Sequence, residues 1–189
     1  MKTPARRRVG LLLASLCLPL FAQAAETQPT HEFSLDNGLK VIVREDHRAP
    51  VVVSQLWYRI GSSYETPEIT GLSHALEHMM FKGSRKLGPG EASRVLRDLG
   101  AEENAFTTDD YTAYYQVLAR DRLPVALEME ADRMAHLSLP ADQFKSEIEV
   151  IKEERRLRTD DNPNALAFER FKAAAYPASG YHTPTIGWM

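Results

Sequence analysis

Two histidines four residues apart are the feature that most narrows what this chain can fold into. Residues 74–78 read His-Ala-Leu-Glu-His, and side chains four apart lie one above the other on an α-helix, so His74 and His78 can bind one metal ion. Glu77 lies beside this pair, where its carboxylate can accept a proton from metal-bound water. The order H-x-x-E-H is the inverted form of the zinc-hydrolase motif H-E-x-x-H. The segment therefore predicts a helix that carries two metal ligands and a general base.

The same segment also fits a purely structural helix that binds no metal. Leu72, Leu76, Met79 and Met80 can form an apolar stripe that faces a core. In that case the two histidines share a helix face by chance. The five residues alone leave this alternative open, and the rest of the chain has to decide.

A third metal ligand must come from another part of the chain, because a catalytic zinc ion typically has three protein ligands and one position for water. The predicted helix over residues 140–158 offers several glutamates. Its apolar stripe consists of Phe144, Ile148 and Ile151. At about 100° per residue, Glu147 and Glu154 lie on nearly the same side and border this stripe. A carboxylate there is unfavourable unless it is paired or binds metal, so Glu147 and Glu154 are the two candidates.

The other charged residues of this helix fit a solvated surface. Charges of both signs lie close together in this segment, as is typical of exposed helix faces with local ion pairs. We therefore expect no role in the site for four of them: Glu149, Glu153, Arg155 and Arg156.

The first 25 residues have the organisation of a secretory signal peptide. Lys2 and the arginines at 6–8 form a positive region, residues 9–21 form an apolar stretch, and Ala22-Gln23-Ala24 is a cleavage site of the small-x-small type. The apolar stretch is too short to span a bilayer, so we expect no stable membrane insertion after cleavage. The sequence predicts a periplasmic or secreted bacterial protein with a mature part of residues 26–189.

The composition excludes several classes of protein. Cys17 is the single cysteine and lies within the predicted signal peptide, so the mature chain has neither disulfides nor thiolate ligands. Cleavage removes four basic residues and leaves 19 Lys and Arg against 26 Asp and Glu, a formal net charge of −7. This acidic balance argues against a nucleic-acid partner.

The patterning predicts strands early in the mature chain and helices late in it. Alternating residues on either side of Asp36-Asn37-Gly38 predict a β-hairpin. Further strands are expected over residues 51–60, as a longer and more buried strand, and within 104–118. Helices are expected after Gly71 and over residues 91–99, 123–137, 140–158 and 165–175. Strands followed by helices, without regular alternation, indicate an α+β fold with a largely antiparallel sheet and helices packed on it.

Three ordered blocks of the sequence resemble the pitrilysin family of zinc peptidases, which includes insulin-degrading enzyme and mitochondrial processing peptidase. Residues 71–83 look like the metal-site helix of that family and the turn that follows it. Residues 104–112 look like its substrate-binding strand, and residues 147–163 look like its second metal-site helix. The resemblance runs from about Thr30 to the last residue. It implies that residues 26–189 form the N-terminal lobe of a clamshell-type zinc peptidase.

The resemblance implies a role for each residue of the metal site. His74, His78 and Glu154 would bind Zn²⁺, and Glu77 would be the general base. Glu147 would support the site without binding the metal. The implied activity is that of a zinc-dependent endopeptidase, which hydrolyses peptides or unfolded polypeptides with metal-activated water.

The resemblance also implies residues that bind the substrate. Asn104 and Ala105 would lie on an edge strand that pairs with the backbone of a peptide, a mode of recognition that tolerates many sequences. Phe81 would line a side-chain pocket, although it fits the core of the domain equally well.

One departure from the family concerns the end of the chain. Family enzymes close related lobes over the peptide, and a later lobe supplies an arginine and a tyrosine to the site. This chain ends at Met189 before such a lobe, so we expect a lobe that is truncated at its C-terminal end. A second lobe would then come from the same longer chain or from a partner subunit, and the fragment alone is not expected to be fully active.

Two alternative functions follow from the same residues. The first is a non-catalytic peptide-binding or scaffold subunit of the family, and the presence of all four metal-site residues argues against it. The second is a zinc hydrolase that acts on a substrate other than peptides. The strand predicted at residues 104–108 argues against that alternative.

Overall fold

The computed structural model describes residues 29–189, and the predicted signal peptide, residues 1–25, lies outside them. The described residues form two units, which divide between Arg48 and Ala49. None of the helices in these residues combines the length and the apolar character that crossing a bilayer requires.

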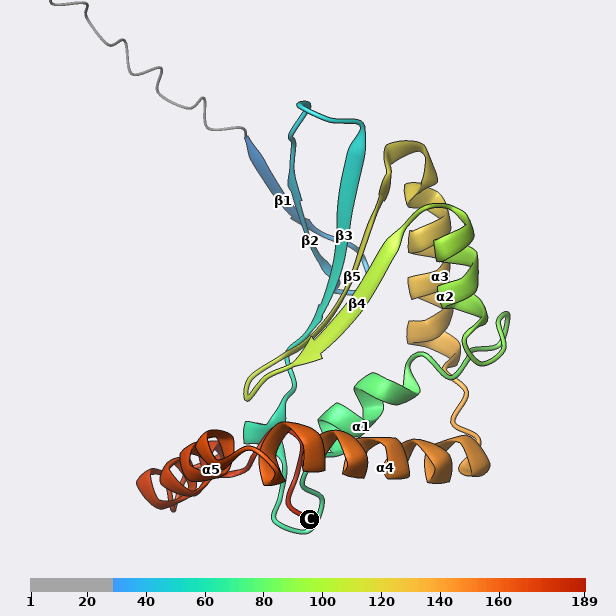
Figure 1. The fold of residues 1–189 in the computed structure, drawn as a ribbon. Helices are drawn as coiled ribbons and strands as arrows, with labels where there is room; N and C mark the ends of the chain where they lie inside the picture. Colours follow the sequence, from blue (N-terminus) through green and yellow to red (C-terminus); the bar gives the residue numbers. More distant parts are fainter. Residues whose placement is uncertain (1–28) are drawn as a thin grey trace, which may run out of the picture. The chain divides into compact units, whose positions relative to one another are not determined.

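The first unit is a β-hairpin. Strand β1 (Thr30–Ser34) pairs antiparallel with β2 (Lys40–Arg44) (Figure 1). Its turn is the predicted one, since Gly38 has a left-handed φ of 86° and the side-chain oxygen of Asn37 accepts the N–H of Leu39 at 3.1 Å. Local turn chemistry is therefore sufficient to place this hairpin.

The second unit is built on an antiparallel sheet with the strand order β3-β5-β4. Its strands are β3 (Val51–Tyr58), β4 (Glu102–Thr107) and β5 (Thr112–Ala119). Strand β5 is central, whereas β4 pairs only with β5 and leaves its other edge without a strand among the described residues. The β4–β5 pair confirms the strands predicted within residues 104–118, although β4 begins two residues earlier.

Five α-helices complete this unit and confirm the predicted α+β class. They are α1 (Leu72–Met79), α2 (Glu91–Asp98), α3 (Leu123–His136), α4 (Ala141–Arg155) and α5 (Pro163–Ala175). Two helix boundaries differ by two residues or more from those predicted. Helix α4 ends at Arg155 and continues as the π-helical segment η3 (Arg156–Asp160). Helix α5 begins before Ala165, because the side chain of Asn162 caps it and Pro163 takes its first position.

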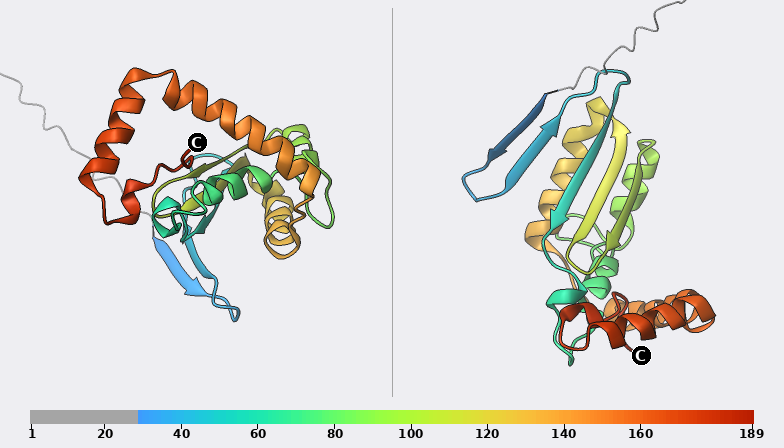
Figure 2. Two further views of the ribbon diagram at one scale, coloured as in Figure 1. Left: turned by 90° about the horizontal axis from the view of Figure 1, so that it is seen from below. Right: turned by 90° about the vertical axis from the view of Figure 1, so that its left-hand side faces the viewer.

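Helices α2 and α3 cover one face of the sheet (Figure 2). Alternate residues of β5 point toward them, and Tyr114, Gln116 and Leu118 are each only 2–3% exposed. Leu96 of α2 and Ala126 of α3 are buried on the same side. The core of the unit therefore lies between this face of the sheet and the two helices.

Strand β3 is less buried than its apolar run predicts. Val51, Val53 and Trp57 are each about half exposed. They share the face of the sheet opposite to α2 and α3, because side chains alternate along a strand. Only one face of β3 contributes to the core of this unit, which an apolar run does not reveal.

Helix α1, which carries the paired histidines, begins with a side-chain cap. The carboxylate of Glu65 accepts the N–H of Gly71 and the N–H of Ser73, each at 2.6 Å. These contacts satisfy backbone donors at the start of the helix, and the negative charge suits the helix N-terminus. Gly71 has a φ of 81°, and a Cβ there would lie 2.6 Å from the carbonyl oxygen of Ile186. The start of α1 is therefore held between a distant carboxylate and the last residues of the chain.

We predict that Glu65→Ala lowers the free energy of unfolding by about 1–2 kcal/mol, because two backbone donors lose their acceptor. Urea denaturation followed by circular dichroism measures this change. Glu65→Gln keeps one acceptor oxygen and should lose less. Equal stability of the wild-type protein and Glu65→Ala would show that the cap does not hold α1.

Candidate active site

The structure brings His74, His78 and Glu154 together where α1 contacts α4. The Nε2 atoms of His74 and His78 lie 3.6 and 3.3 Å from Oε2 of Glu154, and the three possible ligand atoms all lie within 4.8 Å of one another. The two imidazole rings are 4.6 Å apart between centroids. In a tetrahedral zinc site with bonds of about 2 Å, ligand atoms lie roughly 3.3 Å apart. A single ion can therefore reach all three side chains.

Glu147, the other candidate on α4, contacts the opposite side of the His78 ring. Its Oε1 lies 2.9 Å from Nδ1 of His78, and its Oε2 lies 2.5 Å from Nζ of Lys82. A carboxylate at Nδ1 favours the tautomer with a proton on that nitrogen, which leaves the Nε2 lone pair free for a metal. Of the two glutamates that helical geometry leaves open, only Glu154 is within reach of both Nε2 atoms.

The pKa of Glu147 lies below its usual value. Burial acts to raise it, but the hydrogen bonds with Lys82 and His78 and their charges together outweigh burial. The carboxylate of Glu147 therefore stays charged and keeps its contact with the imidazole.

Glu77 lies beside the cluster and is held by the last residue of β4. The hydroxyl of Thr107 donates a hydrogen bond of 2.5 Å to Oε2 of Glu77. Burial raises the pKa of Glu77, and the Thr107 hydrogen bond opposes that rise only in part. A carboxylate with a raised pKa is a stronger base, which suits proton transfer near neutral pH. Sequence reasoning missed Thr107, although it lies in the block 104–108 that it had singled out.

The chemistry of the three clustered side chains fits a zinc ion. Burial lowers the pKa of His74 to about 4, His78 and Arg158 act in the same direction, and Glu154 opposes them. A neutral imidazole keeps a lone pair available for a metal ion. Two imidazole nitrogens and one carboxylate oxygen form a donor set that catalytic zinc sites use.

The cluster lies in a groove of about 920 Å³. One side of the groove is formed by the end of α1 and by residues 104–107 of β4. The other side is formed by α4, α5 and residues 182–186 near the end of the chain. The groove therefore joins residues 104–107 of β4 to the three clustered side chains.

The residues expected to bind substrate all line this groove. Asn104 and Ala105 lie on β4, and the side-chain oxygen of Asn104 accepts the N–H of Ala105 at 2.9 Å. Phe81 follows α1 and is half-buried, with its ring centroid 6.2 Å from that of Tyr114. Phe81 therefore has both of the expected surroundings: it lines the groove, and it also packs on the sheet as a core residue would.

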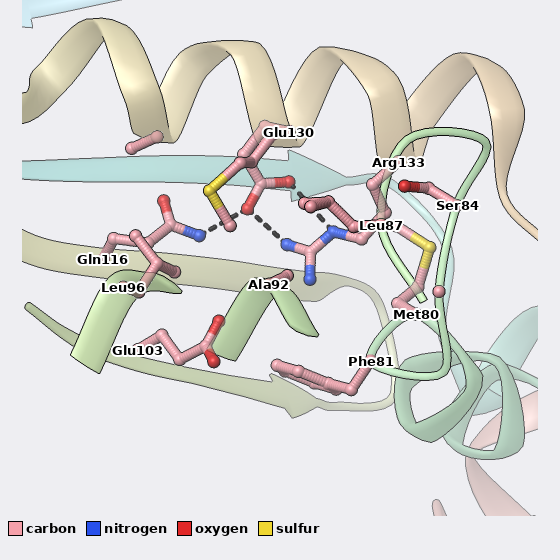
Figure 3. A pocket seen from close by; sticks show the side chains of 13 residues that line it. Met80, Phe81, Ser84, Leu87, Ala92, Leu96, Glu103, Gln116, Glu130 and Arg133 are labelled. Atoms are coloured by element: carbon pink, nitrogen blue, oxygen red, sulfur yellow. Dashed lines mark hydrogen bonds and ion pairs between the residues drawn. The ribbon is translucent and has the colours of Figure 1, made fainter. Parts of the chain in front are cut away.

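A smaller cavity lies behind Phe81, between the sheet and helices α2 and α3 (Figure 3). It contains a buried ion pair between Glu130 and Arg133, and the amide nitrogen of Gln116 donates to the same glutamate. The guanidinium of Arg133 lies over the rings of Phe81 and Tyr114. The cavity measures about 20 Å³, which is room for one water molecule. We therefore assign it to the core and not to substrate binding.

Helix α4 buries a set of residues that differs from the predicted apolar stripe. Glu147, Ile151 and Arg155 are each 7% exposed, whereas Phe144 is 42% exposed. These three residues follow at intervals of four and therefore share one helix face. The prediction of a solvated surface is confirmed for Glu149, Glu153 and Arg156, which are exposed and pair locally.

The prediction for Arg155 was wrong. Its guanidinium donates to both carboxylate oxygens of Glu169, each at 2.9 Å, and to the carbonyl oxygen of Gly187 at 2.8 Å. These bonds connect α4 with α5 and with the end of the chain. The run of charges around Arg155 resembles a solvated face, and only its spacing from Glu147 and Ile151 indicates burial.

Comparison with known proteins agrees with this geometry. Residues 40–187 match the family described as Insulinase (Peptidase family M16). Over 97% of its length the chain is 36% identical to the zinc protease PqqE of Helicobacter pylori, and over 82% it is 30% identical to the uncharacterized zinc protease YmxG of Bacillus subtilis. Over 93% of its length it is also 32% identical to subunit 1 of the human mitochondrial cytochrome b-c1 complex.

A similar fold is found in the crystal structure of a protease from Helicobacter pylori. The TM-score is 0.84 at 34% sequence identity, and the match covers 86% of this chain and 39% of that protease. The chain spans 42%, 38% and 35% of the three relatives named above. It therefore corresponds to less than half of the length of each.

We predict that His74 makes the stability of the metal-free protein depend on pH. Its pKa is about 4 in the folded state and 6.5 in its ordinary state. Between these values the unfolded chain binds more protons, so the free energy of unfolding should rise as the pH rises through this window. Urea denaturation in the presence of a chelator, from pH 4 to pH 7, measures this slope.

The variant is His74→Asn, which removes the imidazole and keeps a polar side chain. His74→Asn should reduce the slope. The same slope in His74→Asn and the wild-type protein would contradict the assignment.

Proposed function

Because the chain belongs to the insulinase family of peptidases, we propose that it provides the metal-binding half of a zinc-dependent endopeptidase. One observation carries the proposal. The two imidazoles of α1 and the carboxylate of Glu154 on α4 lie within bonding reach of one ion, with the carboxylate of Glu77 beside them. The alternative left open by residues 74–78 was a helix whose histidines share one face by chance. That alternative gives no reason for Glu154 to lie beside both histidines.

Neighbouring side chains hold the proposed metal ligands in position. Glu147 orients His78 through Nδ1, and Lys82 holds Glu147 in turn. Such outer contacts fix the tautomer and the orientation of a metal-binding imidazole. Arg158 lies 2.9 Å from the second oxygen of Glu154, which leaves Oε2 for the metal.

The proposed reaction is the hydrolysis of a peptide bond. Zinc at this site would polarise the scissile carbonyl and lower the pKa of a water molecule. Glu77 then takes the proton of the attacking water and passes it to the nitrogen of the leaving amine. The hydroxyl of Thr107 holds the Glu77 carboxylate in position for both transfers.

We propose that the substrate is a peptide or an unfolded polypeptide that binds as an additional strand. No strand of the described residues pairs with the outer edge of β4, and this supports the proposal, since an extended peptide can pair with such an edge through its main chain. Asn104 and Ala105 lie on this edge strand and line the groove. A carbonyl oxygen of the peptide would replace the Asn104 side chain as the acceptor of the Ala105 N–H.

A second lobe, from the same longer chain or from a partner subunit, would complete the enclosure of the peptide. Two facts support this part of the proposal. The groove is large, at about 920 Å³, and the chain spans less than half of the length of the relatives named above. Turnover is therefore to be measured in the protein with its second lobe present.

A non-catalytic subunit is the second candidate function. It is favoured by the similarity to subunit 1 of the human mitochondrial cytochrome b-c1 complex. Such a subunit needs no metal, so the zinc content of the purified protein distinguishes the two candidates.

We predict that Glu77→Gln keeps bound zinc but lowers peptide hydrolysis by about 10²–10⁴-fold, the range that a general base contributes. Zinc analysis and turnover of a fluorogenic peptide test the two parts separately. The control is Glu149→Gln, an exposed change on α4 that should leave both unchanged. Undiminished turnover by Glu77→Gln would remove Glu77 from the proposed mechanism.

We predict that Glu154→Gln abolishes stable zinc binding, because it removes one of three ligands. Glu147→Gln should weaken the affinity by about 10–100-fold, because His78 loses the partner that orients it. Competition with a chromogenic chelator measures both affinities, with the exposed Glu153→Gln as the control. If Glu147→Gln lost zinc and Glu154→Gln kept it, the two assigned roles would be exchanged.

A further inference from the structure

The charged side chains that line the groove are almost all in ion pairs. Lys82 pairs with Glu147, and Arg158 pairs with Glu154. Lys172 and Glu169 pair with Asp109 and Arg155, neither of which lines the groove. Among the lysines, arginines and glutamates that line the groove in the described part of the chain, only Glu77 has no partner of opposite charge. An acidic substrate side chain would therefore have to break an existing pair, and the one unpaired charge belongs to the proposed base Glu77.

The far wall of the groove, opposite β4, presents apolar side chains instead. Val150 of α4 is 49% exposed and Phe168 of α5 is 66% exposed, and both line the groove. Ile186, from the end of the chain, lines the same wall. The free energy falls when another apolar surface covers an exposed apolar area and removes it from water. A peptide that lies along β4 would meet this wall on its other side.

Helix α5 also offers an internal comparison. Phe171 is 67% exposed, nearly the same as Phe168, but it does not line the groove. Both rings can be replaced without opening a cavity in the core, because most of their surface is already in water. Position relative to the groove is therefore the main difference between them.

We propose that Phe168, together with Val150, determines specificity by selecting large apolar side chains in the peptide substrate. This inference rests on the proposed endopeptidase function and names its substrate class. Contact with a leucine or phenylalanine side chain removes the apolar wall from water, whereas a glutamate side chain finds no unpaired lysine or arginine among the described residues that line the groove. Preferred substrates are therefore uncharged apolar segments, of the kind that unfolded polypeptides expose.

The test compares two fluorogenic peptides of equal length, one with Leu and Phe and one with Glu on both sides of the cleaved bond. The zinc-loaded protein with its second lobe should have a higher kcat/KM for the apolar peptide. Phe168→Ser should lower that kcat/KM by about tenfold, which is the effect of losing a modest apolar contact, and should leave the Glu peptide within about twofold. Phe171→Ser should change neither value.

A second pair of variants tests the same wall by reversing its preference. Phe168→Lys should lower kcat/KM for the apolar peptide and raise it for the Glu peptide, because it adds an unpaired cation to the groove. Phe171→Lys should do neither. Zinc content and circular dichroism of each variant show that the metal site and the fold are retained.

The outcomes separate this inference from the proposed function. If the wild-type protein cleaves neither peptide, the endopeptidase function itself fails. If it cleaves the apolar peptide and the variants at Phe168 keep its preference, only the specificity wall is overturned. Equal losses in the Phe168 and Phe171 variants, for both peptides, would overturn it as well.

Discussion

The contact between α1 and α4 through buried charges is the interaction on which the site depends. Glu147 is 7% exposed, and its two oxygens bind Nδ1 of His78 and Nζ of Lys82. A buried carboxylate without such partners is strongly destabilising, so this pairing fixes how the two helices face each other. Two helical turns further along α4, Glu154 then lies opposite both imidazoles. The support of His78 and the approach of Glu154 are consequences of the same helix contact.

Strand β4 connects the sheet to this site in two ways. Its last residue, Thr107, holds the carboxylate of Glu77, and no strand among residues 29–189 pairs with its outer edge, where Asn104 and Ala105 lie. A peptide paired with this edge would therefore be positioned by the same strand that positions the proposed base. Because β5 pairs with β4 along its whole length, this geometry is held by a continuous ladder of backbone hydrogen bonds.

The end of the chain contributes more to the site than its sequence indicates. Gly187 lies against Gly71 at the start of α1, where a Cβ on either glycine would lie within 3 Å of the other segment. Arg155 donates to the carbonyl of the same Gly187 and to Glu169 of α5. The start of α1, the end of α4 and the far wall of the groove are thereby held together. The contact of Gly187 with Gly71 joins residues more than 100 positions apart, and the contacts of Arg155 join residues 14 and 32 positions apart. No pattern within one helix or strand predicts them.

Local periodicity determined much of this protein. The Asp-Asn-Gly turn specified the hairpin, spacing by four placed His74 and His78 on one face, and spacing by seven placed Glu147 and Glu154 on one side of α4. These features follow from backbone geometry and need no knowledge of distant residues. The signal peptide lies outside the described residues and stays a prediction. Which glutamate reaches the two imidazoles, why Arg155 is buried and what holds Glu77 were decided only by the tertiary structure. Each depends on which helices and strands pack against one another. Burial follows from that packing, and residue spacing along a single helix or strand does not specify it.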